Sequence, residues 1–84
     1  RSLSLYWCSR ITDAGLSKVA QGCLQLEWAD LSGCRQITDE GVRKVVQGCL
    51  DLDLLTLTDC DKISSELITD LQNSHPHIYI SKDD

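Results

Sequence analysis

The sequence predicts an α/β solenoid, a right-handed β-α superhelix with a parallel concave sheet and outer helices. Three observations predict this fold. Many residues recur at a spacing of 26. Apolar residues alternate just before each repeated cysteine, as in half-buried strands. A helix-start signal and apolar residues three apart follow each cysteine. We therefore interpret residues 1–84 as one repeat domain of about three units.

The repeat is strongest between residues 8–26 and 34–52, where twelve of nineteen positions are identical. The third copy is weaker, because Gly41 becomes Leu67 and Gly48 becomes Ser74. A terminal repeat meets solvent on one side, so its sequence departs from the others. We expect the chain to be the C-terminal part of a longer array. Positions that keep the 26-residue spacing include Cys8/Cys34/Cys60, Ile11/Ile37/Ile63, Thr12/Thr38, Asp13/Asp39, Gly15/Gly41 and Cys23/Cys49.

The strands are predicted around leucines that precede the repeated cysteines. Leu3 and Leu5 mark the first strand, and Leu55 and Leu57 show the period of two in the third. The second has the small Ala29 before Leu31. These side chains should point into the core, and the residues between them should point away from it. The predicted outward residues are Ser2, Ser4, Tyr6 and Trp7 in the first strand, Trp28, Asp30 and Ser32 in the second, and Leu54, Thr56, Thr58 and Asp59 in the third.

A helix of about nine residues should follow each strand. Thr12, Thr38 and Ser64 are suitable N-caps, and Asp13 and Asp39 would place negative charge in the first turn. Gly22 and Gly48 fall where a helix would end in a left-handed residue. The apolar stripe of each helix is predicted from pairs three residues apart, namely Leu16/Val19, Val42/Val45 and Ile68/Leu71.

A last short strand is predicted over residues 76–81. Direct 26-residue registration would bury Ile78 and expose Ile80, whereas simple alternation buries both and exposes Tyr79. We prefer alternation, because an isoleucine exposed on an edge strand favours aggregation.

Leu31, Cys34, Ile37 and Gly41 belong to a pattern that resembles the cysteine-containing class of leucine-rich repeats. That class runs roughly L-x-L-x-x-C-x-x-I-T-D-x-G-L, and residues 31–42 follow it almost throughout. The resemblance covers about the whole chain. It is closest to the C-terminal recognition domains of F-box proteins, the substrate receptors of cullin-based (SCF) ubiquitin ligases. It therefore implies substrate recognition in the ubiquitin conjugation pathway. The F-box, which would contact the ligase adaptor, is not in these 84 residues.

The candidate site is the concave face of the sheet, where a protein partner would bind. Trp28 and Leu54 occupy the same column on adjacent strands and should touch. An alternative for Trp28 is that it covers a weak core position beside Ala29. Exposed aromatic residues among Ser, Thr and Asp resemble the apolar centre and polar rim of an interface. The predicted partner-binding residues are Tyr6, Trp7, Trp28, Asp30, Leu54, Thr56 and Tyr79.

The sequence does not favour a metal site, a catalytic site or binding to nucleic acid or membrane. The five cysteines are odd in number and follow the repeat, which favours reduced thiols in an intracellular protein of the cytoplasm, the nucleus or both. Cys8, Cys34 and Cys60 are interpreted as a buried column, because no C-x-x-C pair accompanies them. We expect no metal site, cofactor or catalytic machinery. The net charge of −5 and scattered basic residues argue against nucleic acid and anionic membrane.

Three functions remain open. The first is a recognition module within an F-box-type substrate receptor. The second is a structural or assembly subunit of a larger complex without a role in ubiquitin transfer. The third is a small stand-alone regulator that mimics the repeats of a receptor. None of them is an enzyme.

Overall fold

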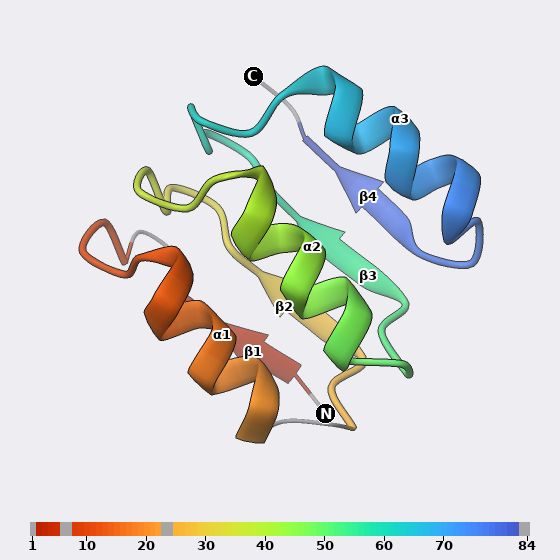
Figure 1. The fold of residues 1–84 in the computed structure, drawn as a ribbon, viewed down its shortest axis with the longest axis horizontal. Coiled ribbons are helices and arrows are strands. Elements are labelled where there is room, and N and C mark those ends of the chain that lie inside the picture. The colour runs from red at the N-terminus through yellow and green to blue at the C-terminus, as the bar shows by residue number, and fades with distance from the viewer. Residues whose placement is uncertain (1, 6–7, 23–24, 83–84) are drawn as a thin grey trace.

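Strands and helices alternate along the chain in the computed structural model, which describes residues 2–5, 8–22 and 25–82 (Figure 1). This alternation confirms the predicted order of elements. The elements are β1 (Ser2–Ser4), α1 (Asp13–Gly22), β2 (Trp28–Asp30), α2 (Asp39–Gly48), β3 (Leu54–Thr56), α3 (Ser65–Ser74) and β4 (Tyr79–Ser81).

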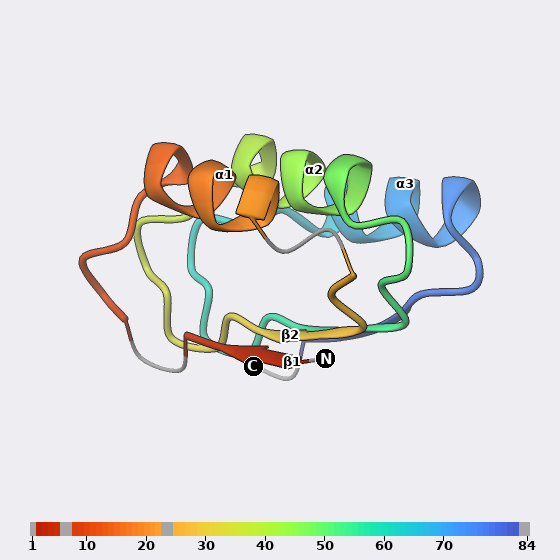
Figure 2. The same cartoon turned by 90° about the horizontal axis from the view of Figure 1, so that it is seen from below.

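The strands form one four-stranded parallel sheet in the order β1-β2-β3-β4. The three helices lie together on one side of it (Figure 2). Trp28 pairs with Ser2 on one side and with Leu54 on the other, at the predicted spacing. Leu54 then pairs with Tyr79, one residue earlier than strict repetition requires. The architecture is that of an α/β repeat fold, and we call the sheet face away from the helices the open face.

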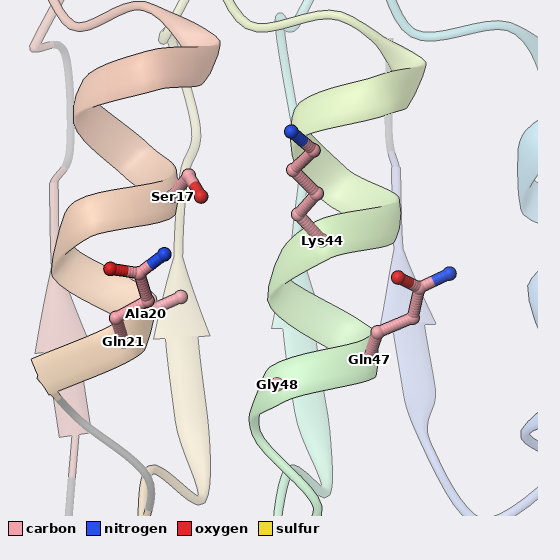
Figure 3. Close-up of a pocket in the computed structure, with 6 residues that line it drawn as sticks. All are labelled: Ser17, Ala20, Gln21, Lys44, Gln47 and Gly48. Atoms are coloured by element: carbon pink, nitrogen blue, oxygen red, sulfur yellow. The ribbon is translucent and has the colours of Figure 1, made fainter.

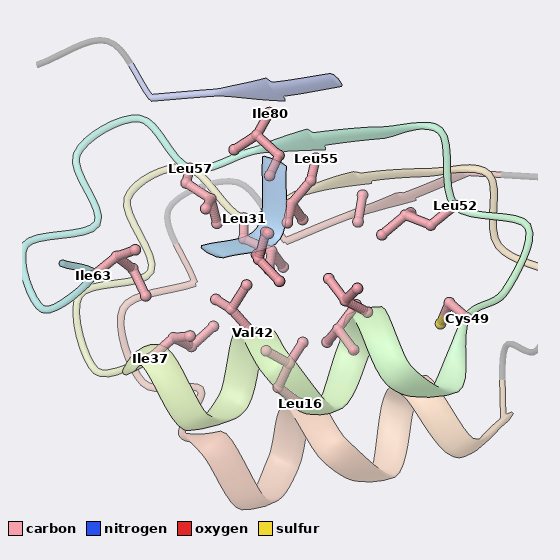
Figure 4. Packing of buried hydrophobic residues seen from close by; sticks show 14 of the residues in the cluster. Leu16, Leu31, Ile37, Val42, Cys49, Leu52, Leu55, Leu57, Ile63 and Ile80 are labelled. Carbon is pink, nitrogen blue, oxygen red and sulfur yellow. The ribbon is translucent and has the colours of Figure 1, made fainter. Parts of the chain in front are cut away.

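The core lies between the sheet and the helix layer (Figure 4). The predicted inward residues Leu31, Leu55 and Leu57 are fully buried, and Ala29 is almost so. Leu3 and Leu5 in the first unit are only partly buried. The helices contribute more than the predicted pairs, because Ala20, Val46 and Leu67 are also buried, whereas Val19 and Ile68 keep some exposure.

The last strand follows simple alternation, as predicted. Ile78 and Ile80 are buried, and Tyr79 is 69% exposed. The third unit is one residue shorter than the others at this point, since Leu55 pairs with Ile80 across 25 positions. The shorter spacing lets Ile80, rather than Tyr79, continue the buried row of Ala29 and Leu55.

The helix ends agree with the prediction at Ser64 but differ from it at Thr38 and at the two helix-end glycines. Ser64 does cap α3, because its hydroxyl accepts a hydrogen bond from the Leu67 N–H at 3.1 Å. Thr38 precedes α2, but its side chain makes no cap bond to its own helix. The prediction of left-handed residues at Gly22 and Gly48 is wrong, since neither glycine has a positive φ and both belong to helices.

The left-handed residues lie instead in the loops that follow β2 and β3. Gly33 has a φ of 77° and Asp59 has a φ of 61°. They occupy the same place in successive units, 26 residues apart. Aspartate is one of the few other residues that adopts this conformation at modest cost. The turn is therefore repeated although the residue changes from glycine to aspartate.

Aspartates in the first turns of α1 and α2 join successive units. Asp13 accepts hydrogen bonds from both the backbone N–H of Thr38, at 2.8 Å, and the Thr38 hydroxyl. Asp39 does the same for Ser64, with distances of 2.8 Å to the N–H and 2.7 Å to the hydroxyl. Each carboxylate therefore satisfies donors at the start of the next helix, where negative charge is favourable.

Helices α1 and α2 pack closely, whereas α3 lies farther from α2. Gly41 makes the close approach possible, because a Cβ added there would lie 2.9 Å from Cγ of Asp13 and closer still to a carboxylate oxygen. Leu67 occupies the corresponding position of α3. The wider separation of α3 from α2 thus occurs where leucine replaces the glycine of the preceding unit.

Candidate functional site

The open face carries an apolar row that crosses three adjacent strands. Trp28 of β2, Leu54 of β3 and Tyr79 of β4 occupy one register position. Trp28 is 37% exposed, Leu54 is half-buried and Tyr79 is 69% exposed. Neighbouring strands are about 4.8 Å apart, so the row spans about 10 Å between its outer strands. It places three large apolar side chains together on a face without helices.

Local strand geometry explains why these side chains are accessible. Each is followed in its strand by a buried residue, namely Ala29, Leu55 and Ile80. Successive strand residues point to opposite faces, so packing of the second residue fixes the direction of the first. The alternative that Trp28 belongs to the core is not supported, because Ala29 is buried while Trp28 stays outside the core cluster.

A polar row runs beside the apolar one. Asp30, Thr56 and Ser81 share the next outward register position, and all three are half-buried. The Asp30 carboxylate accepts a hydrogen bond from the Ser32 N–H at 3.1 Å, which fixes its orientation. Ser32 was expected on this face, but it is 5% exposed and belongs to the turn after β2. The alternation of outward and inward side chains thus stops at the end of β2.

The β1 side of the face offers small polar residues. Ser2 pairs with Trp28 and Ser4 with Asp30, and both serines are exposed. Tyr6 and Trp7, which were predicted to contribute to the site, lie outside the described residues. The described part of the site is therefore made of β2, β3 and β4.

Acidic residues flank the apolar row on the side where the strands begin. Glu27 and Asp53 directly precede Trp28 and Leu54, and both are exposed. The backbone N–H of Asp53 donates to the Glu27 carbonyl at 2.8 Å, which places the two residues on neighbouring chain segments. Glu27 and Asp53 were not among the residues predicted from the sequence for the site, although their 26-residue spacing was a signal for the pair. Together with Asp30, they give the surroundings of the apolar row a negative charge.

The repeated cysteines are structural in the two units where they are buried. The Cys34 thiol donates to the Leu5 carbonyl at 3.0 Å, and the Cys60 thiol donates to the Leu31 carbonyl at 2.9 Å. Burial raises the pKa of Cys34 to about 11 and also raises the pKa of Cys60. Such thiols are poor nucleophiles at neutral pH. The prediction that Cys8 completes a buried column is wrong, because Cys8 is exposed.

The helix side has a shallow depression between α1 and α2 (Figure 3). Its lining is small or polar and includes Ser17, Gln21, Lys44 and Gln47. Ser17 and Lys44 both line it, but no hydrogen bond joins them, and the Lys44 ammonium lies 3.9 Å from the Glu40 carboxylate. Within residues 2–5, 8–22 and 25–82, no group of three or more His, Cys, Asp or Glu side chains could hold a metal ion. The same described residues contain no helix that is both long and apolar enough to span a membrane.

Comparison with known proteins gives one family match. Residues 30–46 match the family model of the leucine-rich repeat. The matched segment runs from the last residue of β2 into α2, so it includes Cys34, Ile37 and Gly41. No curated protein matches the sequence. The match supports a leucine-rich repeat, and repeats of this kind generally mediate protein–protein interaction.

Proposed function

We propose that the chain is a protein–protein interaction module whose open face binds a protein partner. The observation that carries this proposal is the row of Trp28, Leu54 and Tyr79 on adjacent strands. Large apolar side chains gathered on an accessible face are typical of interaction sites, and tryptophan and tyrosine are enriched among residues that dominate binding energy.

The surroundings of the row support the same function. Asp30 and Thr56 lie beside it, and the exposed serines of β1 border it. An apolar centre with a polar rim is the usual anatomy of a protein interface. The row alone is smaller than the ~800 Å² per partner of a standard interface. It would therefore supply the centre of a larger contact area.

The finer proposal concerns the kind of complex. We place the chain in the substrate-recognition region of an F-box-type ubiquitin-ligase subunit, which acts in ubiquitin-dependent protein degradation. The support is the resemblance of residues 31–42 to the cysteine-containing repeats of such receptors. In this proposal the open face is the concave side of a solenoid, and the F-box that contacts the ligase adaptor lies outside these residues. The cytoplasm or the nucleus is the corresponding location.

The binding proposal is tested by matched substitutions of exposed apolar residues. Trp28→Ala and Tyr79→Ala remove side chains of the row, and Leu50→Ala removes a side chain that is 79% exposed in the turn after α2. We expect the first two to weaken partner capture at least tenfold, about 1.4 kcal/mol or more, with melting temperatures close to that of the parent. Leu50→Ala should leave capture unchanged. Equal capture by all four proteins would refute the assignment of the open face.

The ligase proposal has a separate test. The full-length gene product should contain an F-box and co-purify with a cullin scaffold, and Trp28→Ala should abolish ubiquitination of the captured partner without releasing the cullin. A gene product without an F-box that is soluble only with fixed neighbours would instead support the assembly-subunit function.

A further inference from the structure

We propose that the segment bound by the open face is a basic amphipathic helix of the partner protein. Its apolar stripe would lie on Trp28, Leu54 and Tyr79, and its lysine or arginine side chains would lie beside Asp30 and Asp53. This inference rests on the proposed function, because it names the kind of segment that the same face binds. Three properties of the face support it, namely its charge, its exposed aromatic rings and its dimensions.

The carboxylates beside the apolar row give it a negative charge. Asp53 directly precedes β3 and is exposed, and Asp30 lies two residues after Trp28 on the same face. Oδ1 of Asp30 accepts from the Ser32 N–H at 3.1 Å, and within the described residues Oδ2 has no hydrogen-bond partner. Glu27 adds a third carboxylate, but it already interacts with another residue, so the proposal rests on the two aspartates.

The strands bring no basic side chain to balance these carboxylates, since the described residues of β1, β2, β3 and β4 include no lysine or arginine. The basic residues of α1 and α2 belong to the helix layer on the other side of the sheet (Figure 2). Arg35 and Lys62 lie in the loops that lead to α2 and α3, and Arg35 is paired there with Asp61. Lys82 lines a depression with Ile68 of α3, which places it toward the helix layer. A complementary partner therefore supplies positive charge.

The exposed aromatic rings also favour a basic partner. Trp28 is 37% exposed and Tyr79 is 69% exposed. The face of an aromatic ring attracts a lysine or arginine side chain within about 6 Å, and tryptophan does so most strongly. The methylene groups of these side chains cover apolar surface while their charged ends stay accessible. Asp30 lies about 7 Å along the strand from Trp28, so a basic residue packed on the ring has a carboxylate within reach.

The dimensions of the face match those of a helix. The row spans about 10 Å across three strands, and a helix rises about 10.5 Å over seven residues, so residues at i, i+3 or i+4 and i+7 can meet the three side chains. Asp53 lies three residues before Thr56, the partner of Asp30, which is again about 10 Å. A helix with its side chains is about 10–12 Å wide, so it covers the row and reaches the carboxylates on both sides.

Two other occupants fit less well. An extended segment that follows the row would point every second side chain away from the sheet, so it would not place basic residues on both sides of its apolar ones. In an amphipathic helix, basic residues flank the apolar stripe on both sides. A second copy of this chain would bring Asp30 and Asp53 of two open faces together, and like charges repel. Its own helices bury their apolar residues, among them Leu16, Val42 and Leu67.

The test measures binding of synthetic helical peptides to the full chain by fluorescence anisotropy. Peptides of about 18 residues are held helical by a hydrocarbon staple, because free helices of this length are marginal. Each has a stripe of leucine, methionine or phenylalanine, flanked by lysine and arginine, by glutamine or by glutamate. We expect the basic peptides to bind at least about tenfold more tightly than the glutamate peptides. Trp28→Ala should weaken their binding at least about tenfold.

Charge substitutions separate complementarity from a loss of structure. Asp30→Asn keeps an oxygen that accepts from the Ser32 N–H, and Asp53→Lys reverses an exposed charge. Together they should weaken binding of the basic peptides at least about tenfold and strengthen binding of the glutamate peptides, a gain that misfolding does not produce. Glu66→Lys, in the first turn of α3, is the matched control for charge reversal and should change either affinity by less than about twofold.

The proposal is overturned if glutamine or glutamate peptides bind as tightly as basic ones. It is also overturned if unstapled basic peptides with a central proline, which breaks a helix, bind as tightly as the stapled ones. A third refuting result is that no helical peptide binds although partner capture still depends on Trp28, in which case the proposed function stands. If peptide binding and partner capture are both insensitive to Trp28→Ala, the proposed function fails as well.

Discussion

Asp13 is expected to stabilise the helix that follows it in the next unit, and Asp13→Ala tests this directly. Its carboxylate accepts two hydrogen bonds from Thr38, and Thr38 makes no side-chain cap to α2. Asp13 therefore replaces the usual cap. Loss of an N-cap costs about 0.5–2 kcal/mol, and hydrogen bonds to a charged group are stronger than neutral ones. We expect a loss of about 2 kcal/mol in the free energy of unfolding.

The assay is urea unfolding followed by circular dichroism, with thermal melting as a second measurement. For a domain of this size, 2 kcal/mol corresponds to a fall of about 8–16 °C in melting temperature. Glu40→Ala is the matched control, because Glu40 is also an acidic residue in the first turn of a helix. Its side chain is exposed, and the ion pair that it makes with Lys44 is long, at 3.9 Å. Its loss should be within about 0.5 kcal/mol.

A double-mutant cycle separates the pairwise interaction from a general effect of charge. Asp13→Ala and Thr38→Val should be non-additive by about 1 kcal/mol, since each removes the same contact. Asp13→Asn, which retains one acceptor oxygen, should lose less than Asp13→Ala. Equal losses for Asp13→Ala and Glu40→Ala, or strict additivity in the cycle, would refute the reasoning.

Two further predictions concern the core. Leu57→Ala should cost about 2–5 kcal/mol in urea unfolding, because Leu57 is fully buried and its loss leaves a cavity; a loss near zero would contradict its place in the core. Stability should also fall as the pH rises from about 9 to about 11, since the Cys34 thiol ionises near 9.0 in the unfolded chain and near 11 in the folded one. The unfolded state then binds fewer protons than the folded state, so the free energy of unfolding should fall by roughly 2 kcal/mol between these two pH values. Unfolding measured at both pH values should show a weaker dependence in Cys34→Ala, and an unchanged dependence would argue against this origin.

The periodicity of the sequence predicted the features that depend on one unit alone. The outward position of Tyr79 followed from alternation with Ile78 and Ile80, and the pairing of Trp28 with Leu54 followed from the repeat. Both depend on which face a strand residue occupies, and that property is local. The alternation of strand residues is accordingly sufficient to predict that the described members of the candidate site face away from the core.

Contacts between units were harder to predict. The repeat places Asp13 in the first turn of α1, but it does not reveal that Thr38 of the next unit binds its carboxylate. Cys8 occupies the same position of the repeat as Cys34, but it is exposed, and among the described residues its thiol donates to no carbonyl of another unit. The left-handed turn was not predicted, because Gly33 and Asp59 are different residue types at the same position of the repeat. The repeated Gly22 and Gly48 instead predicted left-handed residues at the helix ends.

The change from Gly41 in the second unit to Leu67 in the third has a consequence for the shape of the sheet. Hydrogen bonding keeps neighbouring strands at a fixed separation, about 4.8 Å, whatever residue is present. The helix layer has no such restraint, and it widens where Leu67 replaces glycine. We expect two layers of unequal width to bend toward the narrower one. We therefore expect position 67, although it lies in the helix layer, to influence the curvature of the face that carries Leu54 and Tyr79.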